Sequence, residues 1–580
     1  MRRSLRRPRA TGQTPGPDNG RRVSASYAEV TARPLAIARQ RVTPAGLALG
    51  VTIAAAAATR FSWLNLMEFK GDEAEACRLA LHALGYSEPG LGRFFPTQGL
   101  TSSIGIPNPP LFVYLMAVPL AIVRSPIAAV SVVAAANVAS IWLCYVVGKR
   151  CFSPFVGLAS ATLFALSPWG IVFSRKIWAQ DLLPLCTTLF ILELHALLVR
   201  RKPAAVFWLF VIVAAATQLH FSAWILAPIL VAALILGRKT IERRWLLPGA
   251  AVAALLYVPF LILHAGAIYR VSGHRVTHHA PGIVARFETA AHFTFAIVGG
   301  DKMSFLLGSQ SALAAPVSFV LGPAALAGLI VAFRARQEPS LRHVRLLFVA
   351  WYVLPLVALS ILPVHDYIHY FIITFPLPFF GIAYLIERVA TRQRVLGGLA
   401  LAACLACFLT LDARLFRTIL HDGGAPGDYG VAYRYKTAAV RAMLANSHGR
   451  SFAIGTDRDF RPVRRLRDFR FLIWNSNPAA ATHQEPATYG YVIVSKSGPV
   501  PPLLAKDPHR SSYRRIDVGP LELITVPLLG RSSDYSTARA RTTSGSGLTG
   551  RGLERATGSR LPRAARASAS TAHARTKNAA

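Results

Sequence analysis

Residues 223–264, AWILAPILVAALILGRKTIERRWLLPGAAVAALLYVPFLILH, consist of two long apolar runs joined by a short basic connection. Apolar runs of roughly 17–25 residues are typical of helices that cross a lipid bilayer. Similar runs recur near residues 45–64, 109–123, 127–147, 155–173, 181–198, 205–221, 312–333, 346–363, 367–386 and 395–411. This repetition predicts an all-α polytopic membrane protein with about 11–13 transmembrane helices.

Composition and charge agree with this class. The chain has 580 residues, of which 53% are hydrophobic, and a net charge of +37. In a soluble protein such a charge would suggest nucleic acid, but here the arginines lie in the two tails and in short connections between apolar runs. We therefore predict contact with membrane lipid and no nucleic-acid partner.

The positive-inside bias orients the chain. It predicts that the basic connections face the cytoplasm: 199–202, 237–244, 333–345 and 390–394. Alternation then places these segments outside: 174–181, 218–223, the long loop 265–311 and 364–370. One region leaves two alternatives, because only two runs separate the outer segment 65–108 from the basic residues 148–150. Either 109–147 contains one crossing and a partial or re-entrant piece, or one basic cluster breaks the rule.

Composition also divides the chain into parts. After the last apolar run, SFAIGT, YGYVIVSK and LELITV are short β-type runs separated by turn residues. They predict a small extracytoplasmic α/β domain with a helix near 434–446. The predicted parts are a disordered basic cytoplasmic tail (1–44), a transmembrane domain (45–424) with a first outer loop (65–108), the α/β domain (425–526) and a disordered basic tail (527–580).

Acidic residues are concentrated in NLMEFKGDEAEACRLALHAL (65–84), directly after the first apolar run. Glu68 and Glu75 fit a solvated loop face. Asp72 and Glu73 begin an amphipathic stretch, and a carboxylate held there could act as a general base towards an acceptor hydroxyl or amine. Ionisable groups beside a membrane are costly, which favours a functional reason for keeping them.

Cationic and hydrogen-bonding residues lie in the predicted outer connections and suit a phosphate group. They are Arg175 and Lys176 in SRKIWAQD, His220 in QLHFS, and His365 and His369 in HDYIHY. A carboxylate facing such groups fits displacement at a sugar carbon with a lipid phosphate as the leaving group.

Other interpretations of these residues stay open. Arg175 and Lys176 could anchor a helix end at the membrane interface, and His220 could be a satisfied helix-end histidine. His365 and His369, with Asp366 between them, have the spacing of metal ligands, but the sequence offers no evident third ligand, so no metal site is predicted. Asp428 and Tyr429, in GGAPGDYG, fit a structural turn.

The motifs FKGDEAEACRLA, LSPWGIVFSRKIWAQDLLP, QLHFSA, HYFIITFPLP and GGAPGDYGVAYRYK, in this order, resemble glycosyltransferase family 39. This family contains protein O-mannosyltransferases and aminoarabinose transferases with the GT-C membrane fold. The resemblance implies that Asp72 is the base and Glu73 the adjacent acid that positions acceptor or donor. It also implies that Arg175, Lys176 and His369 contact the donor phosphate.

The resemblance implies an inverting glycosyltransferase, multi-pass in the cell membrane, with its active site on the outer face. Its donor would be a polyprenyl-phosphate sugar, and its acceptor a protein, lipid or glycan. We find neither the extended acidic motif nor the β-trefoil insert of the eukaryotic mannosyltransferases. The identity of their acceptor therefore cannot be carried over to this sequence. No cofactor is predicted, and a need for a divalent metal is left open. The alternatives are a transporter or flippase of lipid-linked sugars and a scaffold that binds cell-wall polymer.

Overall fold

The structure is a computed structural model. It describes residues 43–88, 93–102, 106–274, 282–309, 311–362, 367–455, 467–477, 489–496, 504 and 509–527. The two predicted basic tails lie almost wholly outside these residues, as do His365 and Asp366.

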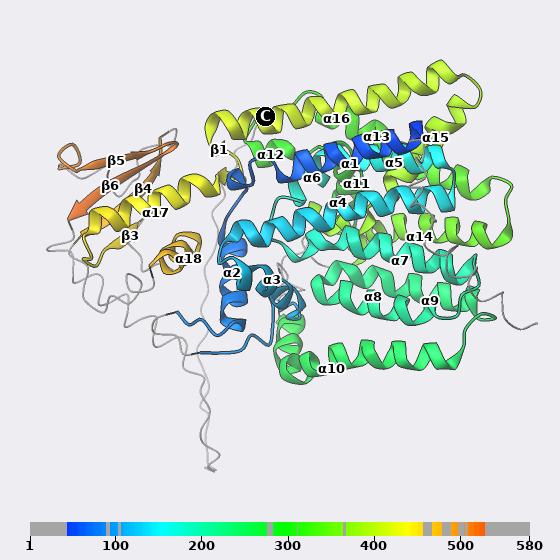
Figure 1. The fold of residues 1–580 in the computed structure, drawn as a ribbon, viewed down its shortest axis with the longest axis horizontal. Helices are drawn as coiled ribbons and strands as arrows, with labels where there is room; N and C mark the ends of the chain where they lie inside the picture. The colour runs from blue at the N-terminus through cyan, green and yellow to red at the C-terminus, as the bar shows by residue number, and fades with distance from the viewer. Residues whose placement is uncertain are drawn as a thin grey trace, which may run out of the picture. The chain divides into compact units, whose positions relative to one another are not determined.

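Apolar helices make up most of the described chain and lie side by side (Figure 1). Seven helical segments are long and apolar enough to cross a membrane. They are α1 (Pro44–Phe61), α4 (Pro126–Cys151), α7 (Leu183–Leu198, with the preceding turn η2, Ala179–Leu182), α10 (Arg243–His274), α13 (Ala314–Arg334), α14 (Pro339–Ile361) and α16 (Arg394–Asp422).

A further span is broken, and several apolar helices are short. The broken span joins η4 (Ile368–Thr374) to α15 (Leu377–Ala390) with a bend of 61°. The shorter helices are α3 (Leu111–Ile122), α5 (Pro154–Ala165), α8 (Ala205–Leu219) and η3 with α9 (Phe221–Ile225 and Leu226–Gly237). Within the described residues these helices agree with the predicted all-α polytopic class.

Residues 109–147 contain most of the long helix α4 and, before it, the short helix α3. Its 12 residues span about 18 Å, well short of a hydrocarbon core of about 30 Å. The 26-residue α4 is long enough to cross. These two lengths agree with one crossing plus a short piece, but α5 also has only 12 residues, so this alternative and the side on which residues 148–150 lie stay predictions.

Three helix starts share one local signal, a serine followed by proline. Ser125, Ser153 and Ser167 accept a backbone N–H of α4, α5 and α6 (Pro168–Phe173), and each is followed by proline as the first helical residue. The serine satisfies an unpaired N–H, and proline has none to satisfy. The consecutive helices α4 and α5 then pack closely at two glycines, where a Cβ added to Gly148 would lie 2.6 Å from the Cα of Gly157.

Residues 265–311 differ from the predicted long loop. They contain the end of α10 and two further helices, α11 (Ile283–Gly299) and α12 (Met303–Leu307). Polar residues such as Arg286 and His292 interrupt the apolar pattern of α11, which explains why hydropathy alone missed it. Arg286 donates to the carbonyl of Ser360 at 3.1 Å, next to the end of α14.

The chain after α16 forms the predicted α/β region (Figure 1). A hairpin of β1 (Gly424–Ala425) and β2 (Gly430–Val431) precedes a four-stranded sheet with the order β3-β4-β6-β5. Strands β3 and β4 are parallel, whereas β5 and β6 are antiparallel. The remaining elements are α17 (Tyr433–Ser447), β3 (Ala453–Gly455), α18 (Arg467–Ser476), β4 (Tyr489–Ser495), β5 (Arg515–Val518) and β6 (Leu521–Pro527).

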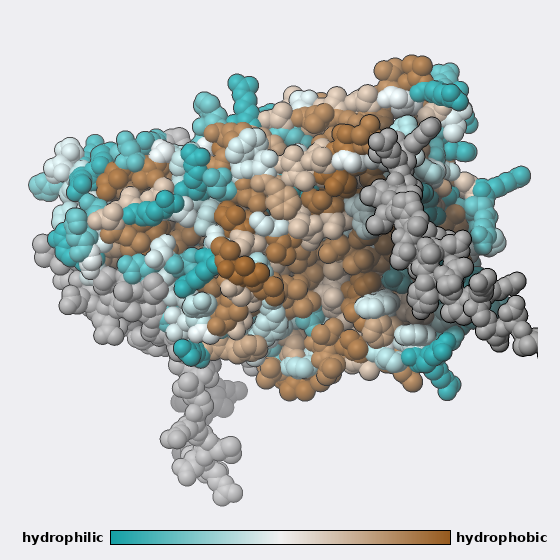
Figure 2. All heavy atoms as spheres, viewed as in Figure 1, coloured by the Kyte–Doolittle hydropathy of each residue, from teal (hydrophilic) through white to brown (hydrophobic). Residues whose placement is uncertain are grey.

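The helix near 434–446 and the three predicted strands are present. Because α18 packs against α2 (Gly71–Ala83), the division of 425–526 from the membrane domain stays a prediction. Figure 2 shows hydrophobic side chains spread over the helical bundle, while hydrophilic ones gather over the α/β region and at the helix ends. Large apolar side chains exposed on the bundle, such as Leu255 and Ile262, suit contact with lipid acyl chains.

Candidate active site

The start of α2 fixes the two predicted catalytic acids in different environments. The backbone N–H of Lys70 donates to Glu73 Oε2 at 2.9 Å, so that the Glu73 carboxylate reaches back to the residue before the first turn of α2. This bond turns Glu73 inward, where its side chain is fully buried. Asp72 precedes it on the helix and remains exposed. Both carboxylates lie in the first turn, where the helix dipole stabilises negative charge.

Glu68 is the centre of a buried chain of ion pairs. Its Oε1 lies 2.5 Å from Lys70 Nζ, and its Oε2 lies 3.0 Å from Lys176 Nζ. Lys70 also donates to Asp428 Oδ2 at 2.8 Å. The Glu68 side chain has 0% exposure, so its interpretation as part of a solvated loop face is wrong. Its two carboxylate oxygens instead join Lys70 to Lys176.

Lys176 connects the buried ion pairs to a cluster of aromatic and imidazole rings. Its ammonium lies 3.4 Å from the ring centroid of Trp178, a cation–π contact. The Trp178 ring lies 5.4 Å from that of His369, and His369 lies 5.8 Å from His220. Lys176 is therefore a buried residue rather than an interface anchor, and it belongs to one group with the two predicted histidines.

His220 has a defined tautomer. Its Nδ1 accepts the backbone N–H of Ser222 at 3.2 Å, which caps η3. A backbone N–H can only donate, so a neutral imidazole must carry its proton on Nε2. The residue thus satisfies a helix end, as one interpretation expected, and still has an N–H that can donate to a ligand.

Two cavities adjoin at Asp72. The first, of about 260 Å³, is lined by Asp72, Asn108, Trp178, Gln180, His220 and His369, among others; we call it the histidine cavity. The second, of about 490 Å³, is lined by Asp72, Glu75, Arg78, Phe95, Gln98 and Arg467, among others; we call it the loop cavity. They share Asp72 and residues 99–101. Asp72 is therefore accessible from both cavities.

The surroundings of the two acids change their proton affinity. Asp72 is open to solvent, but the protein around it removes part of the hydration of its carboxylate and so raises its pKa, although the positive charges of Lys176 and Arg467 oppose this. Burial also raises the pKa of Glu73 to about 7, with Lys176 opposing and Glu68 adding to the shift. At neutral pH Glu73 is therefore partly protonated, whereas the more exposed Asp72 is better suited to accept a proton.

Arg175 lies elsewhere. Its guanidinium donates to the backbone carbonyls of Thr59, Ser62 and Trp63 at 3.0, 2.6 and 3.0 Å. These carbonyls end α1, where a cation is favourable. Arg175 does not line the histidine cavity, and this geometry gives no support to the predicted contact with the donor phosphate.

Asp181 is a buried acid that the sequence analysis did not single out. Its side chain is 1% exposed, and neither carboxylate oxygen has a hydrogen-bond partner among the described residues. Its charge interacts with those of Lys176, Glu68 and Glu73. The only sequence signal is its position between polar residues and an apolar run. Despite this concentration of acids, no group of three His, Cys, Asp or Glu side chains in the described part of the chain could hold a metal ion.

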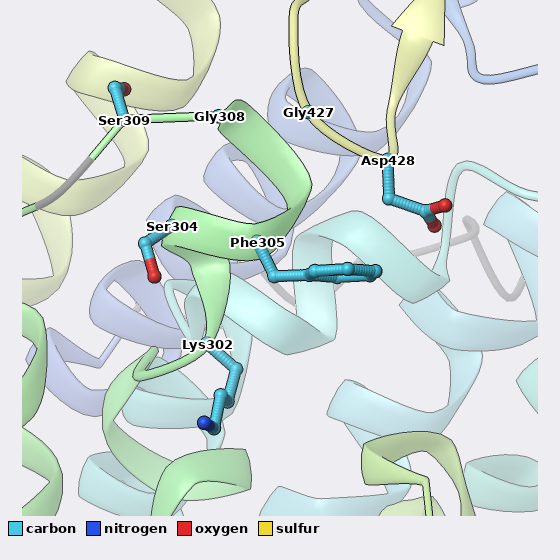
Figure 3. Close-up of a pocket in the computed structure, with 7 residues that line it drawn as sticks. All are labelled: Lys302, Ser304, Phe305, Gly308, Ser309, Gly427 and Asp428. Atoms are coloured by element: carbon cyan, nitrogen blue, oxygen red, sulfur yellow. The ribbon is translucent and has the colours of Figure 1, made fainter. Parts of the chain in front are cut away.

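A third cavity is lined by Asp428, the residue to which Lys70 donates. It has a volume of about 660 Å³ and is formed by α12 and the β1–β2 turn (Figure 3). Phe305 and Asp428 project to the same side, whereas Lys302 points away. The backbone N–H of Asp428 donates to the carbonyl of Phe305 at 2.9 Å. Asp428 thus organises the turn, as expected, and also binds Lys70.

The arrangement of helices can be compared with known structures. ArnT from Cupriavidus metallidurans bound to undecaprenyl phosphate matches with a TM-score of 0.52 at 10% identity, over 83% of this chain and 97% of that one. The chain has the GT-C fold. The apo form of this ArnT matches this GT-C chain with a TM-score of 0.50 at 12% identity and the same coverage.

Further comparisons concern parts of the GT-C chain. The family model described as dolichyl-phosphate-mannose-protein mannosyltransferase matches residues 107–263, which include Lys176 and His220 but not Asp72. The Archaeoglobus fulgidus oligosaccharyltransferase in complex with Zn and sulfate has a TM-score of 0.47 at 12% identity, over 77% of this chain and 67% of that one. No curated protein matches the sequence. The family model and the GT-C fold confirm the resemblance inferred from the motifs.

Proposed function

We propose that this protein is an integral-membrane glycosyltransferase. It moves a sugar from a polyprenyl-phosphate donor to an acceptor on the outer face of the membrane, with inversion at the anomeric carbon. The observation that carries the proposal is the position of Asp72, which lines both the histidine cavity and the loop cavity. A base between two cavities can take a proton from an acceptor substrate in one cavity and direct the resulting nucleophile at a donor in the other.

In the proposed reaction, Asp72 accepts the proton of an acceptor hydroxyl. The hydroxyl oxygen forms a bond to the anomeric carbon as the bond from that carbon to the phosphate oxygen breaks. The electron pair of the broken bond leaves with the polyprenyl phosphate. The proton remains on Asp72 until water removes it. Attack from the face opposite the phosphate inverts the anomeric centre.

The departing phosphate would gain negative charge in the histidine cavity. His220 can donate its Nε2 proton there, and His369 lines the same wall. Lys176 supplies positive charge from behind Trp178. Fixed donors and charges in a site of low dielectric stabilise developing charge more strongly than water does. In this proposal a lipid-linked donor would reach the cavity through the bilayer.

Glu73 and Glu68 would hold this arrangement rather than react. Glu68 fixes Lys176 at 3.0 Å, and Glu73 fixes the start of α2. Partial protonation of Glu73 limits the negative charge around Lys176, so that the ammonium can interact with a phosphate as well as with Glu68.

The main alternative is a transporter of lipid-linked sugars. The two functions are separated by incubating purified protein in vesicles with a series of radiolabelled polyprenyl-phosphate sugars. The proposal predicts release of free polyprenyl phosphate and label on a new product. Movement of intact donor between leaflets without any product would contradict it.

A further inference from the structure

The residues that line the loop cavity differ from those of the histidine cavity, apart from the shared Asp72 and residues 99–101. Its walls come from α2, from the segment 93–102, from His264 of α10 and from Arg467 of α18. Its volume of about 490 Å³ falls within the range of cavities that hold small ligands. Since the histidine cavity offers the phosphate-binding groups, the loop cavity is left for the second substrate. This inference rests on the proposed function and adds the acceptor to it.

An aromatic ring is displayed openly at this cavity. Phe95 lines the cavity and is 66% exposed. Its ring stacks on Tyr114, with centroids 5.4 Å apart and planes at 24°. One face of the ring is thus supported. A supported and exposed ring suits the flat C–H face of a sugar, which packs on aromatic surfaces.

The segment that carries Phe95 is fixed in place. The Tyr114 hydroxyl donates to the carbonyl of Pro96 at 2.6 Å. The imidazole Nε2 of His264 lies 3.2 Å from both the carbonyl oxygen and the hydroxyl of Thr97. These contacts tie the segment to α3 and α10. Less conformational entropy is therefore lost when a ligand stacks on Phe95.

The charges around the cavity cancel. Its lining contains two carboxylates, Asp72 and Glu75, and two guanidiniums, Arg78 and Arg467. Arg78 is neutralised by Glu75, to which its Nε and Nη2 donate at 2.8 and 2.6 Å. A phosphorylated or acidic ligand would need an excess of positive charge, which this cavity does not provide. Planar polar side chains beside an aromatic ring instead suit a neutral ligand that carries hydroxyl groups.

We propose that the loop cavity binds a neutral saccharide as the acceptor, stacked on Phe95, with one hydroxyl directed at Asp72. A peptide acceptor is the competing class. A saccharide presents several hydroxyls at fixed spacing to Gln98, Thr101 and Arg78, and its apolar face to the ring. The transferred sugar would therefore extend a glycan.

The test is a binding measurement on the full-length protein in lipid nanodiscs. The probes are neutral trisaccharides of glucose, mannose, galactose and arabinose, a trisaccharide that contains glucuronic acid, and a peptide rich in serine and threonine. Saturation-transfer NMR detects binding and shows which probe protons contact the protein. We expect at least one neutral trisaccharide to bind, with its ring C–H protons receiving the most saturation.

Phe95→Ala should weaken this binding by about tenfold, and Phe95→Trp should retain it. Phe305→Ala is the matched control, because Phe305 is 69% exposed and lines only the third cavity among those described; it should leave binding unchanged. Failure of every neutral trisaccharide to bind, equal binding by the Phe95→Ala variant, or peptide binding that Phe95→Ala weakens would overturn the inference.

Binding of undecaprenyl phosphate to the same variants separates the two proposals. We expect the wild type and the Phe95→Ala variant to bind it equally. Intact binding of this lipid without saccharide binding would overturn the acceptor assignment alone. Saccharide binding that depends on Phe95, in a wild-type protein that does not bind the lipid, would instead overturn the proposed donor and so the proposed function.

Discussion

Replacement of Lys176 by methionine tests the buried ion-pair chain. Methionine nearly preserves the length of the side chain and its contact with Trp178 but removes the charge. Lys176 Nζ lies 3.0 Å from Glu68 Oε2, and the two side chains are 4% and 0% exposed. Breaking a buried pair from one side costs about 3–5 kcal/mol. Because Glu68 keeps Lys70 at 2.5 Å, we expect a loss of about 3 kcal/mol in the free energy of unfolding.

The same replacement should slow transfer more than it weakens donor binding. Loss of a fixed group that stabilises transition-state charge typically lowers kcat by about 100- to 1000-fold. The charge of Lys176 also lowers the pKa values of Asp72 and Glu73. Its removal should therefore move the acidic limb of the pH–rate profile to higher pH, because Asp72 would need a higher pH to ionise.

The assay measures kcat and KM for a polyprenyl-phosphate sugar between about pH 5 and pH 8, the range in which protein stability tends to be highest, together with chemical unfolding. The double variant Lys176→Met/Glu68→Gln is the control for stability. It should recover part of the lost free energy, because no carboxylate is left with a missing partner. It should not recover kcat. A Lys176→Met variant with wild-type kcat and an unshifted pH profile would refute the role of Lys176.

Three single replacements give further predictions. Glu73→Gln should stabilise the protein at pH 8 by about 3 kcal/mol and much less at pH 5. The reason is that the folded-state pKa of Glu73 is raised from 4.5 to about 7, so the wild type loses stability as pH rises through 7. Chemical unfolding of both proteins at the two pH values measures this difference. Arg175→Met should lower the free energy of unfolding by about 3 kcal/mol, because carbonyls at the end of α1 lose their donors, while the Kd for undecaprenyl phosphate stays unchanged. Asp428→Asn should lower kcat by about fivefold through looser positioning of Lys70, and an unchanged kcat would exclude this link.

The helical class and the α/β region could be predicted because apolar runs and short β-type runs are local patterns. The apolar runs near 109–123 and 127–147 correspond to α3 and α4, but whether the first run crosses the membrane could not be predicted, because it is shorter than a full span. Helix α11 was missed for the opposite reason, since Arg286 and His292 hide an apolar helix that packs against others in the bundle.

The candidate site was only partly predictable. Asp72 stood out because acids are rare beside membrane helices. Nothing local in the sequence distinguishes Lys176, which faces the rings of the histidine cavity, from its neighbour Arg175, which faces the backbone of α1. The direction of each side chain depends on contacts made by residues more than a hundred positions away, such as Glu68 and Thr59.

The most direct test of the central claim compares the wild type with the Asp72→Asn variant in a single transfer assay. Asparagine keeps the shape of the side chain but cannot accept the proton of the acceptor. Both proteins are first shown to bind undecaprenyl phosphate with the same Kd. We predict that the variant then loses transfer by about 1000-fold or more, since a general base contributes roughly 100- to 10,000-fold. Transfer at the wild-type rate by a variant that binds the lipid normally would contradict the account.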